Sequence, residues 1–106
     1  MKFEFATATR IVFGRGRMNE VGAIARTFGR SALIVIGRSP KRARPLTDRL
    51  DAEGISHTLH SISGEPRIAD VRAGVERAKA GRCDLVIGFG GGSAIDCGKA
   101  ISAMLT

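Results

Sequence analysis

The chain of 106 residues contains no tryptophan and no tyrosine, and aromatic residues make up only 5% of it. Its core must therefore be aliphatic, and the hydrophobic content of 43% is sufficient to build one. No apolar run approaches the roughly 20 residues that a helix needs to cross a bilayer. The N-terminal stretch, MKFEFATATR, is too polar and too acidic for a signal peptide. We predict one domain of ordinary size with no membrane segment.

Cysteine is also scarce, since Cys83 and Cys97 are the only two and form no CxxC motif. Two such thiols suit a reducing cytosol better than a disulfide framework, so we expect a cytoplasmic protein in which they are buried or half-buried.

Acidic residues are few, with 10 Asp and Glu against 17 Lys and Arg, and the formal net charge is +7. The basic residues do not form one block, and no stacking aromatics surround the single tight cluster. We therefore expect no nucleic-acid partner, and two explanations stay open, a solvated basic surface and a site for a phosphorylated cofactor. The cluster consists of Arg38, Lys41, Arg42 and Arg44.

Glycine, by contrast, is concentrated in one stretch. The apolar run 85–87 is typical of a strand buried on both faces, and four of the next five residues, 88–92, are glycine. Ser93 and Asp96 then form a Ser-x-x-Asp capping pattern at the start of a helical run, which predicts Ser93 as the N-cap. A strand, a glycine turn and a helix N-terminus in this order predict a site where backbone N–H groups bind phosphate.

Two common phosphate motifs do not fit this stretch. A P-loop would need glycine where Ser93 precedes Gly98-Lys99, and the Gly-x-Gly-x-x-Gly fingerprint fits Gly88 and Gly90 but meets Ser93 in third place.

Helical and strand patterns alternate along the rest of the chain. Helices are predicted at 21–28, 46–53 and 68–80, ended by Gly29, Gly54 and Gly81, and strands at 32–36 and 55–62. Phe3 and Phe5, followed by 11–13, predict an N-terminal β-hairpin. The fold class is therefore α/β, a mostly parallel Rossmann-like sheet with flanking helices and an N-terminal β-hairpin. Ligands bind such sheets at the carboxyl ends of the strands, where the loops 37–40 and 88–93 fall.

His57 and His60 are spaced three apart on a predicted strand, so they point to opposite faces and predict no metal site. We identify no catalytic and no metal-ligating residue in this chain.

The glycine stretch resembles a family motif. Gly90-Gly91-Gly92-Ser93, with Asp96 and Lys99, resembles the GGGSxxDxxK motif of the iron-containing (group III) alcohol dehydrogenases. Residues 10–16, RIVFGRG, resemble the opening strand and FGxG turn of that family. Glu65-Pro66, with Val71 and Gly74, lies where that family usually has Asn-Pro and a V-x-x-G helix.

The resemblance covers the whole chain, but the chain covers only the family's N-terminal domain. It implies that residues 1–106 are the NAD(P)-binding part of a longer two-domain enzyme, and that these residues alone do not catalyse. It implies hydride transfer between an alcohol and its aldehyde or ketone. Fe²⁺ or Zn²⁺, held by one Asp and two or three His of a helical C-terminal domain, would polarise the alcohol oxygen. A homodimer is expected.

The resemblance also suggests a role for each site residue. The N–H groups of Gly90, Gly91, Gly92 and Ser93 are expected to bind the cofactor pyrophosphate, with Asp96 and Lys99 near the cofactor.

The second predicted strand ends in a departure from the family pattern. The family often has Asp there, bonded to the ribose hydroxyls of NAD, whereas this chain has Gly37, Arg38 and Ser39. An arginine without the acid favours a 2′-phosphate, which predicts NADP, or use of both NADP and NAD.

Two rival functions stay open at the level of the sequence. One is a maleylacetate reductase-like enzyme that needs no metal. The other is a non-catalytic module that binds nucleotides or nucleic acid.

Overall fold

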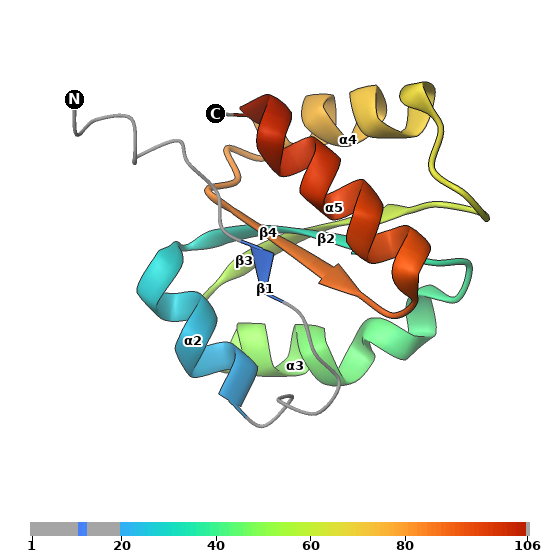
Figure 1. Ribbon diagram of the computed structural model, residues 1–106. Coiled ribbons are helices and arrows are strands. Elements are labelled where there is room, and N and C mark those ends of the chain that lie inside the picture. The colour runs from blue at the N-terminus through green and yellow to red at the C-terminus, as the bar shows by residue number, and fades with distance from the viewer. Residues whose placement is uncertain (1–10, 13–19, 106) are drawn as a thin grey trace.

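The computed structural model of the protein describes residues 11–12 and 20–105. Four strands form one sheet in the order β1-β4-β2-β3, every neighbouring pair is parallel, and helices cover both faces (Figure 1). The predicted α/β class with a parallel, Rossmann-like sheet is confirmed. In chain order the elements are β1 (Ile11–Val12), α2 (Val21–Phe28), β2 (Ser31–Ile36), the 3-10 helix η2 (Pro40–Ala43), α3 (Arg44–Ala52), β3 (Ser56–Ser61), α4 (Ile68–Ala80), β4 (Leu85–Phe89) and α5 (Gly92–Leu105).

The N-terminal hairpin is only partly within the described residues. Its second arm contains β1, which pairs in parallel with β4 through Ile11 opposite Val86 and Val12 opposite Ile87. The first predicted arm, around Phe3, lies outside the described residues, so the hairpin stays a prediction.

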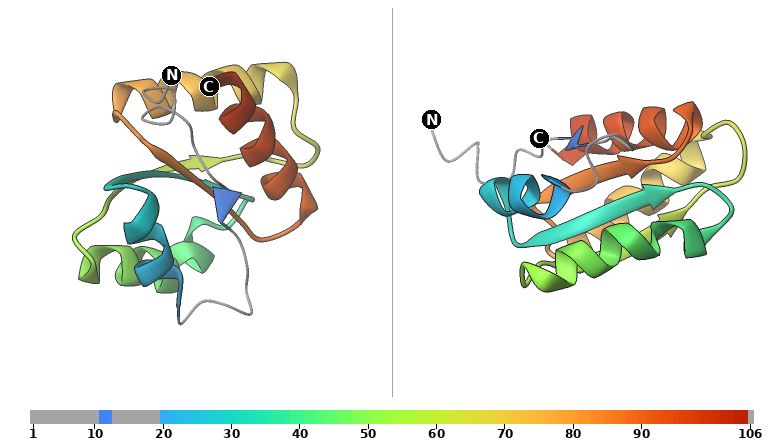
Figure 2. Two further views of the ribbon diagram at one scale, coloured as in Figure 1. Left: turned by 60° about the vertical axis from the view of Figure 1, so that its left-hand side comes forward. Right: turned by 90° about the horizontal axis from the view of Figure 1, so that it is seen from below.

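Helices lie on both faces of the sheet (Figure 2), and an aliphatic core lies between the sheet and the helices on each face. Ile34 of β2 and Ile87 of β4 pack toward α2 and α3, while Leu33 and Val86 pack toward α4 and α5. All four side chains are almost completely buried. Because adjacent residues of a strand point to opposite faces, the apolar runs of β2 and β4 supply both cores at once.

Glycine and proline set most of the helix boundaries near the predicted positions. Gly29 follows α2 and Gly81 follows α4, as predicted. Helix α3 begins two residues earlier than predicted, at Arg44. Pro45 fits in its first turn because proline has no N–H, and the N–H groups of a first turn have no partner within the helix. The longest described helix, α5, has 14 residues. None of the described helices is long and apolar enough to cross a membrane.

The start of α5 differs from the prediction. Ser93 is the second residue of the helix rather than its N-cap, because the carbonyl of Gly91 accepts the first helical bond, from the Ile95 N–H at 3.2 Å. Gly92 adopts helical backbone despite the low helix propensity of glycine, so the helix includes the last residue of the glycine stretch. The helix still begins with N–H groups that have no intrahelical acceptor, now from Gly91 onward.

The connections that follow the neighbouring strands β2 and β4 run to opposite faces of the sheet. From β2 the chain passes through η2 into α3, which packs on the face of α2, and from β4 it passes into α5, which packs beside α4 (Figure 1). In open α/β sheets such a switch point leaves a crevice outside the carboxyl ends of the two strands. The fold therefore places the loop after β2 opposite the glycine turn after β4.

Candidate functional site

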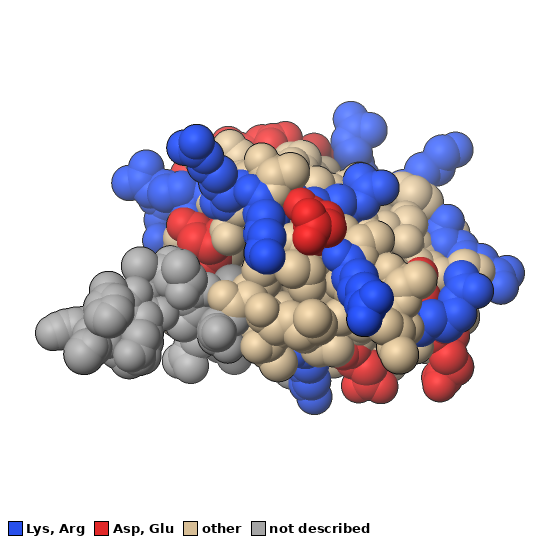
Figure 3. Space-filling view, turned by 90° about the horizontal axis from the view of Figure 1, so that it is seen from above, with Lys and Arg blue, Asp and Glu red and all other residues tan. Residues whose placement is uncertain are grey.

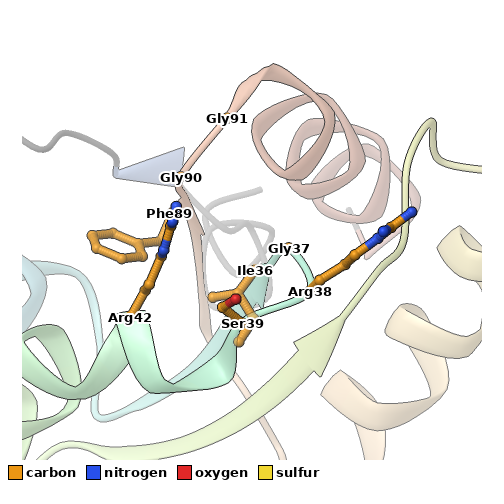
Figure 4. A pocket seen from close by; sticks show the side chains of 8 residues that line it. All are labelled: Ile36, Gly37, Arg38, Ser39, Arg42, Phe89, Gly90 and Gly91. Carbon is orange, nitrogen blue, oxygen red and sulfur yellow. The ribbon is translucent and has the colours of Figure 1, made fainter.

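A cavity of about 220 Å³ lies at this switch point (Figure 4). Residues from both loops line it, so the two loops that the sequence predicted at one edge of the sheet do meet there. A wider hollow of about 580 Å³ adjoins it and is lined by four of the same residues. The described lining residues of the cavity are Ile36, Gly37, Arg38, Ser39, Arg42, Phe89, Gly90 and Gly91.

The glycines at the cavity differ from those of the interior in what a Cβ atom would meet. At Gly37, Gly90 and Gly91 no heavy atom lies within 4 Å of the Cβ position, and the same holds at Gly92. At Gly88, which lies within β4 before the turn, a Cβ would lie 3.0 Å from the Cα of Ile95. Gly88 thus serves close packing of β4 against α5, whereas the turn glycines leave backbone open to a ligand.

Gly90 is required by its conformation as well. Its φ of +114° lies in a region that side chains with a Cβ rarely adopt. This residue turns the chain from β4 into α5, so that α5 begins directly after the lining residue Gly91. Open backbone at a helix N-terminus fits a phosphate group.

Two arginines line the cavity and point in different directions (Figure 4). Arg42 points from η2 toward Phe89 and Gly90. Arg38 points away from Gly90, and its Nε donates to the Ser63 hydroxyl at 3.2 Å. None of the described lining residues is acidic, so the cavity presents positive charge and fits an anion.

The structure brings together five of the nine predicted site residues. Gly37, Arg38, Ser39, Gly90 and Gly91 line the cavity, while Gly92 and Ser93 follow directly in the first turn of α5. Ser39 occupies the N-cap position of η2 but makes no side-chain capping bond.

Asp96 and Lys99 lie further along α5. Both are exposed, and neither lines the cavity. Since Ser93 lies within α5 rather than at its N-cap, the predicted Ser93–Asp96 capping arrangement does not apply. Their predicted places near a cofactor stay predictions.

Three lining residues were not assigned to the site from the sequence: Ile36, which was predicted only as the end of a strand, Arg42 and Phe89. Phe89 ends β4 and packs its ring against the core on the α3 side. Arg42 belongs to the basic cluster noted in the sequence, which was left open between a solvated surface and a cofactor site. Only the 3-10 turn of η2 determines that Arg42 faces the cavity.

The histidines and cysteines are placed as predicted. His57 Nε2 lies 3.0 Å from Asp51 on α3, and His60 Nε2 lies 2.8 Å from the Asp70 carbonyl on α4, so the two rings do lie on opposite faces. Burial raises the pKa of both the Cys83 and Cys97 thiols. Over the described residues, no group of three His, Cys, Asp or Glu could hold a metal ion.

The face formed by α4 and α5 carries dispersed charge (Figure 3). Lysine and arginine side chains are spread over it, with Asp and Glu between them and an uncharged area among them. The described part of this face therefore lacks the continuous basic stripe that would track a nucleic-acid backbone.

Known proteins support the family resemblance. The family model described as iron-containing alcohol dehydrogenase matches residues 8–106. NADH-dependent butanol dehydrogenase A of Clostridium acetobutylicum is 33% identical over 108 residues, which cover 97% of this chain and 28% of that protein. The chain thus spans little more than a quarter of the length of this curated relative.

Solved structures agree with this finding. The structure of NADH-dependent butanol dehydrogenase A from Thermotoga maritima is 33% identical and matches 92% of this chain and 27% of its own with a TM-score of 0.70. The structure of sulfoacetaldehyde reductase from Bifidobacterium kashiwanohense in complex with NAD⁺ is 28% identical in sequence. The match covers 91% of this chain and 26% of that chain, with a TM-score of 0.69. With its fold, its glycine turn and its sequence in agreement, the chain belongs to the iron-containing alcohol dehydrogenase family.

Proposed function

We propose that this chain is the dinucleotide-binding part of an NAD(P)-dependent oxidoreductase that interconverts an alcohol with its aldehyde or ketone. The observation that carries the proposal is the cavity at the switch point between β2 and β4, where an open glycine turn meets two arginines. The relatives fit this function, since the butanol dehydrogenases are named NADH-dependent and the sulfoacetaldehyde reductase was solved with NAD⁺.

The residues of the glycine turn would hold the cofactor's pyrophosphate. The backbone N–H groups of Gly90, Gly91, Gly92 and Ser93 lie at the N-terminus of α5, where no Cβ atom of the three glycines keeps a phosphate oxygen away. When bound, the cofactor would supply or accept the hydride, and the protein's part is to bind and orient it.

The loop after β2 would take the adenosine ribose and set the choice between NADP and NAD. Gly37 leaves open space at the strand end, and Arg38 and Ser39 offer donors without a carboxylate to repel a 2′-phosphate. This arrangement supports NADP, or use of both cofactors. The names of the butanol dehydrogenase relatives mention NADH, so cofactor preference is the part of the proposal that most needs a direct test.

The described residues do not fit a resident metal, because they offer no cluster of metal-ligating side chains. If the reaction uses Fe²⁺ or Zn²⁺, we propose that its ligands belong to the second domain of a longer protein. The homodimer, the cytoplasmic location and the small alcohol or aldehyde substrate also stay predictions.

A titration with NADPH and with NADH tests the proposal. Binding is measured by calorimetry and by nicotinamide fluorescence, which the chain does not obscure because it has no tryptophan and no tyrosine. Gly91→Asp places a carboxylate at the phosphate position and should abolish binding. Ala73→Asp adds the same charge on the exposed face of α4 and should leave binding unchanged.

The proposal is wrong if neither nucleotide binds the wild-type chain, or if Gly91→Asp binds as the wild type does. Binding that favours NADPH would support the assignment of Gly37 and Arg38. Binding that favours NADH would keep the dinucleotide site and overturn the NADP preference.

A further inference from the structure

Arg42 lies on the side of the crevice opposite α5, and its side chain extends toward the α5 side. It belongs to η2, on the side of α3, yet it lines both the cavity and the wider hollow together with Gly90 and Gly91. In Figure 4 its side chain points to Phe89 and Gly90. Its guanidinium therefore faces the glycine turn that would hold the pyrophosphate.

The backbone beneath Arg42 is fixed. Its N–H donates to the Ser39 carbonyl at 3.0 Å, which closes the 3-10 turn, and the next residue, Ala43, is fully buried in the core under α3. The direction of the Arg42 Cα–Cβ bond thus follows from a packed turn, while its exposed side chain extends from there.

Arg42 is also available for a ligand. No described acid lies within ion-pairing distance of its guanidinium, whereas Arg44, two residues on, pairs with Asp48 at 3.5 Å. Arg38 is already bonded to Ser63 and turned away from Gly90. Of the two described arginines that line the cavity, Arg42 is the one that faces the turn.

We propose that Arg42 binds the diphosphate of the dinucleotide from across the crevice and thereby completes the site opposite the N–H groups of α5. This inference rests on the proposed dinucleotide function. A planar guanidinium can donate two parallel hydrogen bonds to a phosphate, so it would fix the orientation of the diphosphate as well as neutralise it. The diphosphate would lie between the N–H donors of the Arg42 guanidinium and the N-terminus of α5.

This role separates Arg42 from a group that reads the 2′-phosphate. Both NADH and NADPH contain the diphosphate, so loss of Arg42 should weaken the two equally. Loss of a charge-assisted bond to phosphate predicts roughly a 10-fold weaker affinity for each. Loss of a residue that binds the 2′-phosphate would instead weaken the affinity for NADPH alone.

Calorimetric titration of NADH and of NADPH into four variants tests the inference. Arg42→Ala should weaken both by about the same factor, and Arg42→Lys should give an intermediate loss, because it keeps the charge without the fork. Arg44→Ala removes the same charge outside the cavity and should leave both affinities close to the wild type. Arg38→Ala should affect NADPH more than NADH. Circular dichroism and thermal unfolding of each variant confirm that it is folded.

The inference is overturned if Arg42→Ala weakens only NADPH, or if Arg42→Ala and Arg44→Ala behave alike. Either result would leave the dinucleotide function intact, provided that the wild-type chain binds. If the wild-type chain binds neither nucleotide, the proposed function is wrong and the role of Arg42 is wrong with it.

Discussion

Alanine at Gly91 and alanine at Gly74 add the same methyl group, and the structure predicts opposite consequences. At Gly91 no heavy atom lies within 4 Å of the Cβ position. At Gly74, in α4, the Cβ would overlap the Ile101 Cδ1 of α5 and lie 3.1 Å from the His60 Cδ2. The first glycine leaves room for a ligand, and the second leaves room for a neighbouring helix.

The effect of each change on stability can be worked out from these contacts. Gly74→Ala gains about 1 kcal/mol of helix propensity but overpacks the core, which costs about 1–3 kcal/mol, so a net loss of about 1 kcal/mol is expected. Gly91→Ala loses roughly 0.5–1 kcal/mol because alanine is a poor N-cap. It regains about 0.4–1 kcal/mol from a less flexible unfolded chain. The free energy of unfolding of the Gly91 variant should therefore stay close to that of the wild type.

Cofactor binding should respond in the reverse order. The methyl group of Gly91→Ala stands in the cavity where a phosphate would approach the backbone, so the affinity for NADH should fall about 10-fold or more. Gly74→Ala lies away from the cavity lining and should bind NADH as the wild type does wherever it is folded.

Urea unfolding followed by circular dichroism, beside an NADH titration, measures both quantities for each variant. The reasoning is refuted if Gly91→Ala binds NADH normally, or if it loses binding only in step with a loss of stability.

Three further predictions concern groups away from the cavity. Asp84→Ala should lower the free energy of unfolding by about 1–3 kcal/mol, because its carboxylate accepts two backbone N–H groups of the α2–β2 turn at 3.1 Å; an unchanged urea midpoint would contradict this. The backbone N–H at the start of α4 lowers the pKa of Asp70 below its ordinary 3.8, so this carboxylate stabilises the fold above that pH. The stability gap between wild type and Asp70→Ala should shrink as the pH falls through the lowered pKa; a gap independent of pH would refute it. Burial raises the pKa of Cys83 and Cys97, so both thiols should alkylate more slowly in the native than in the unfolded chain at pH 8. Their contribution to stability is present below the ordinary thiol value of 9.0 and is lost as the pH rises through the raised pKa; equal alkylation rates would be inconsistent with that burial.

The elements that short-range patterns determine were predicted well. Helix α4 follows from its apolar residues at helical spacing and from Gly81 at its end, and β2 and β4 follow from short aliphatic runs. The meeting of the two loops was predictable too, since parallel strands bring their carboxyl ends to one edge of a sheet.

The parts that failed depend on local geometry that residue types do not encode. Ser93 has the right spacing to Asp96 for a cap, but Gly92 already belongs to the helix, so the helix begins before Ser93. The basic cluster was visible, yet a single 3-10 turn determines that Arg42 rather than Lys41 or Arg44 lines the cavity.

Contacts between segments far apart in the chain also could not be predicted from the sequence. Asp84 caps the backbone of Arg30 and Ser31, more than fifty positions earlier in the chain, and its carboxylate lies where a Cβ of Gly29 would stand. Gly29 was predicted as a helix stop, and the structure adds that no larger residue fits beside Asp84. Such a requirement appears only when the two segments are packed together.

The most direct test of the account is a titration of the isotope-labelled chain with NADPH and with NADH, followed through its backbone amide resonances. The account predicts that the amides of Gly37, Gly90, Gly91, Gly92 and Ser93 shift together on addition of nucleotide, while those of the α4 face stay in place. Shifts confined to other parts of the chain, or no shift with either nucleotide, would contradict the claim that the glycine turn at the β2–β4 crevice is a dinucleotide site.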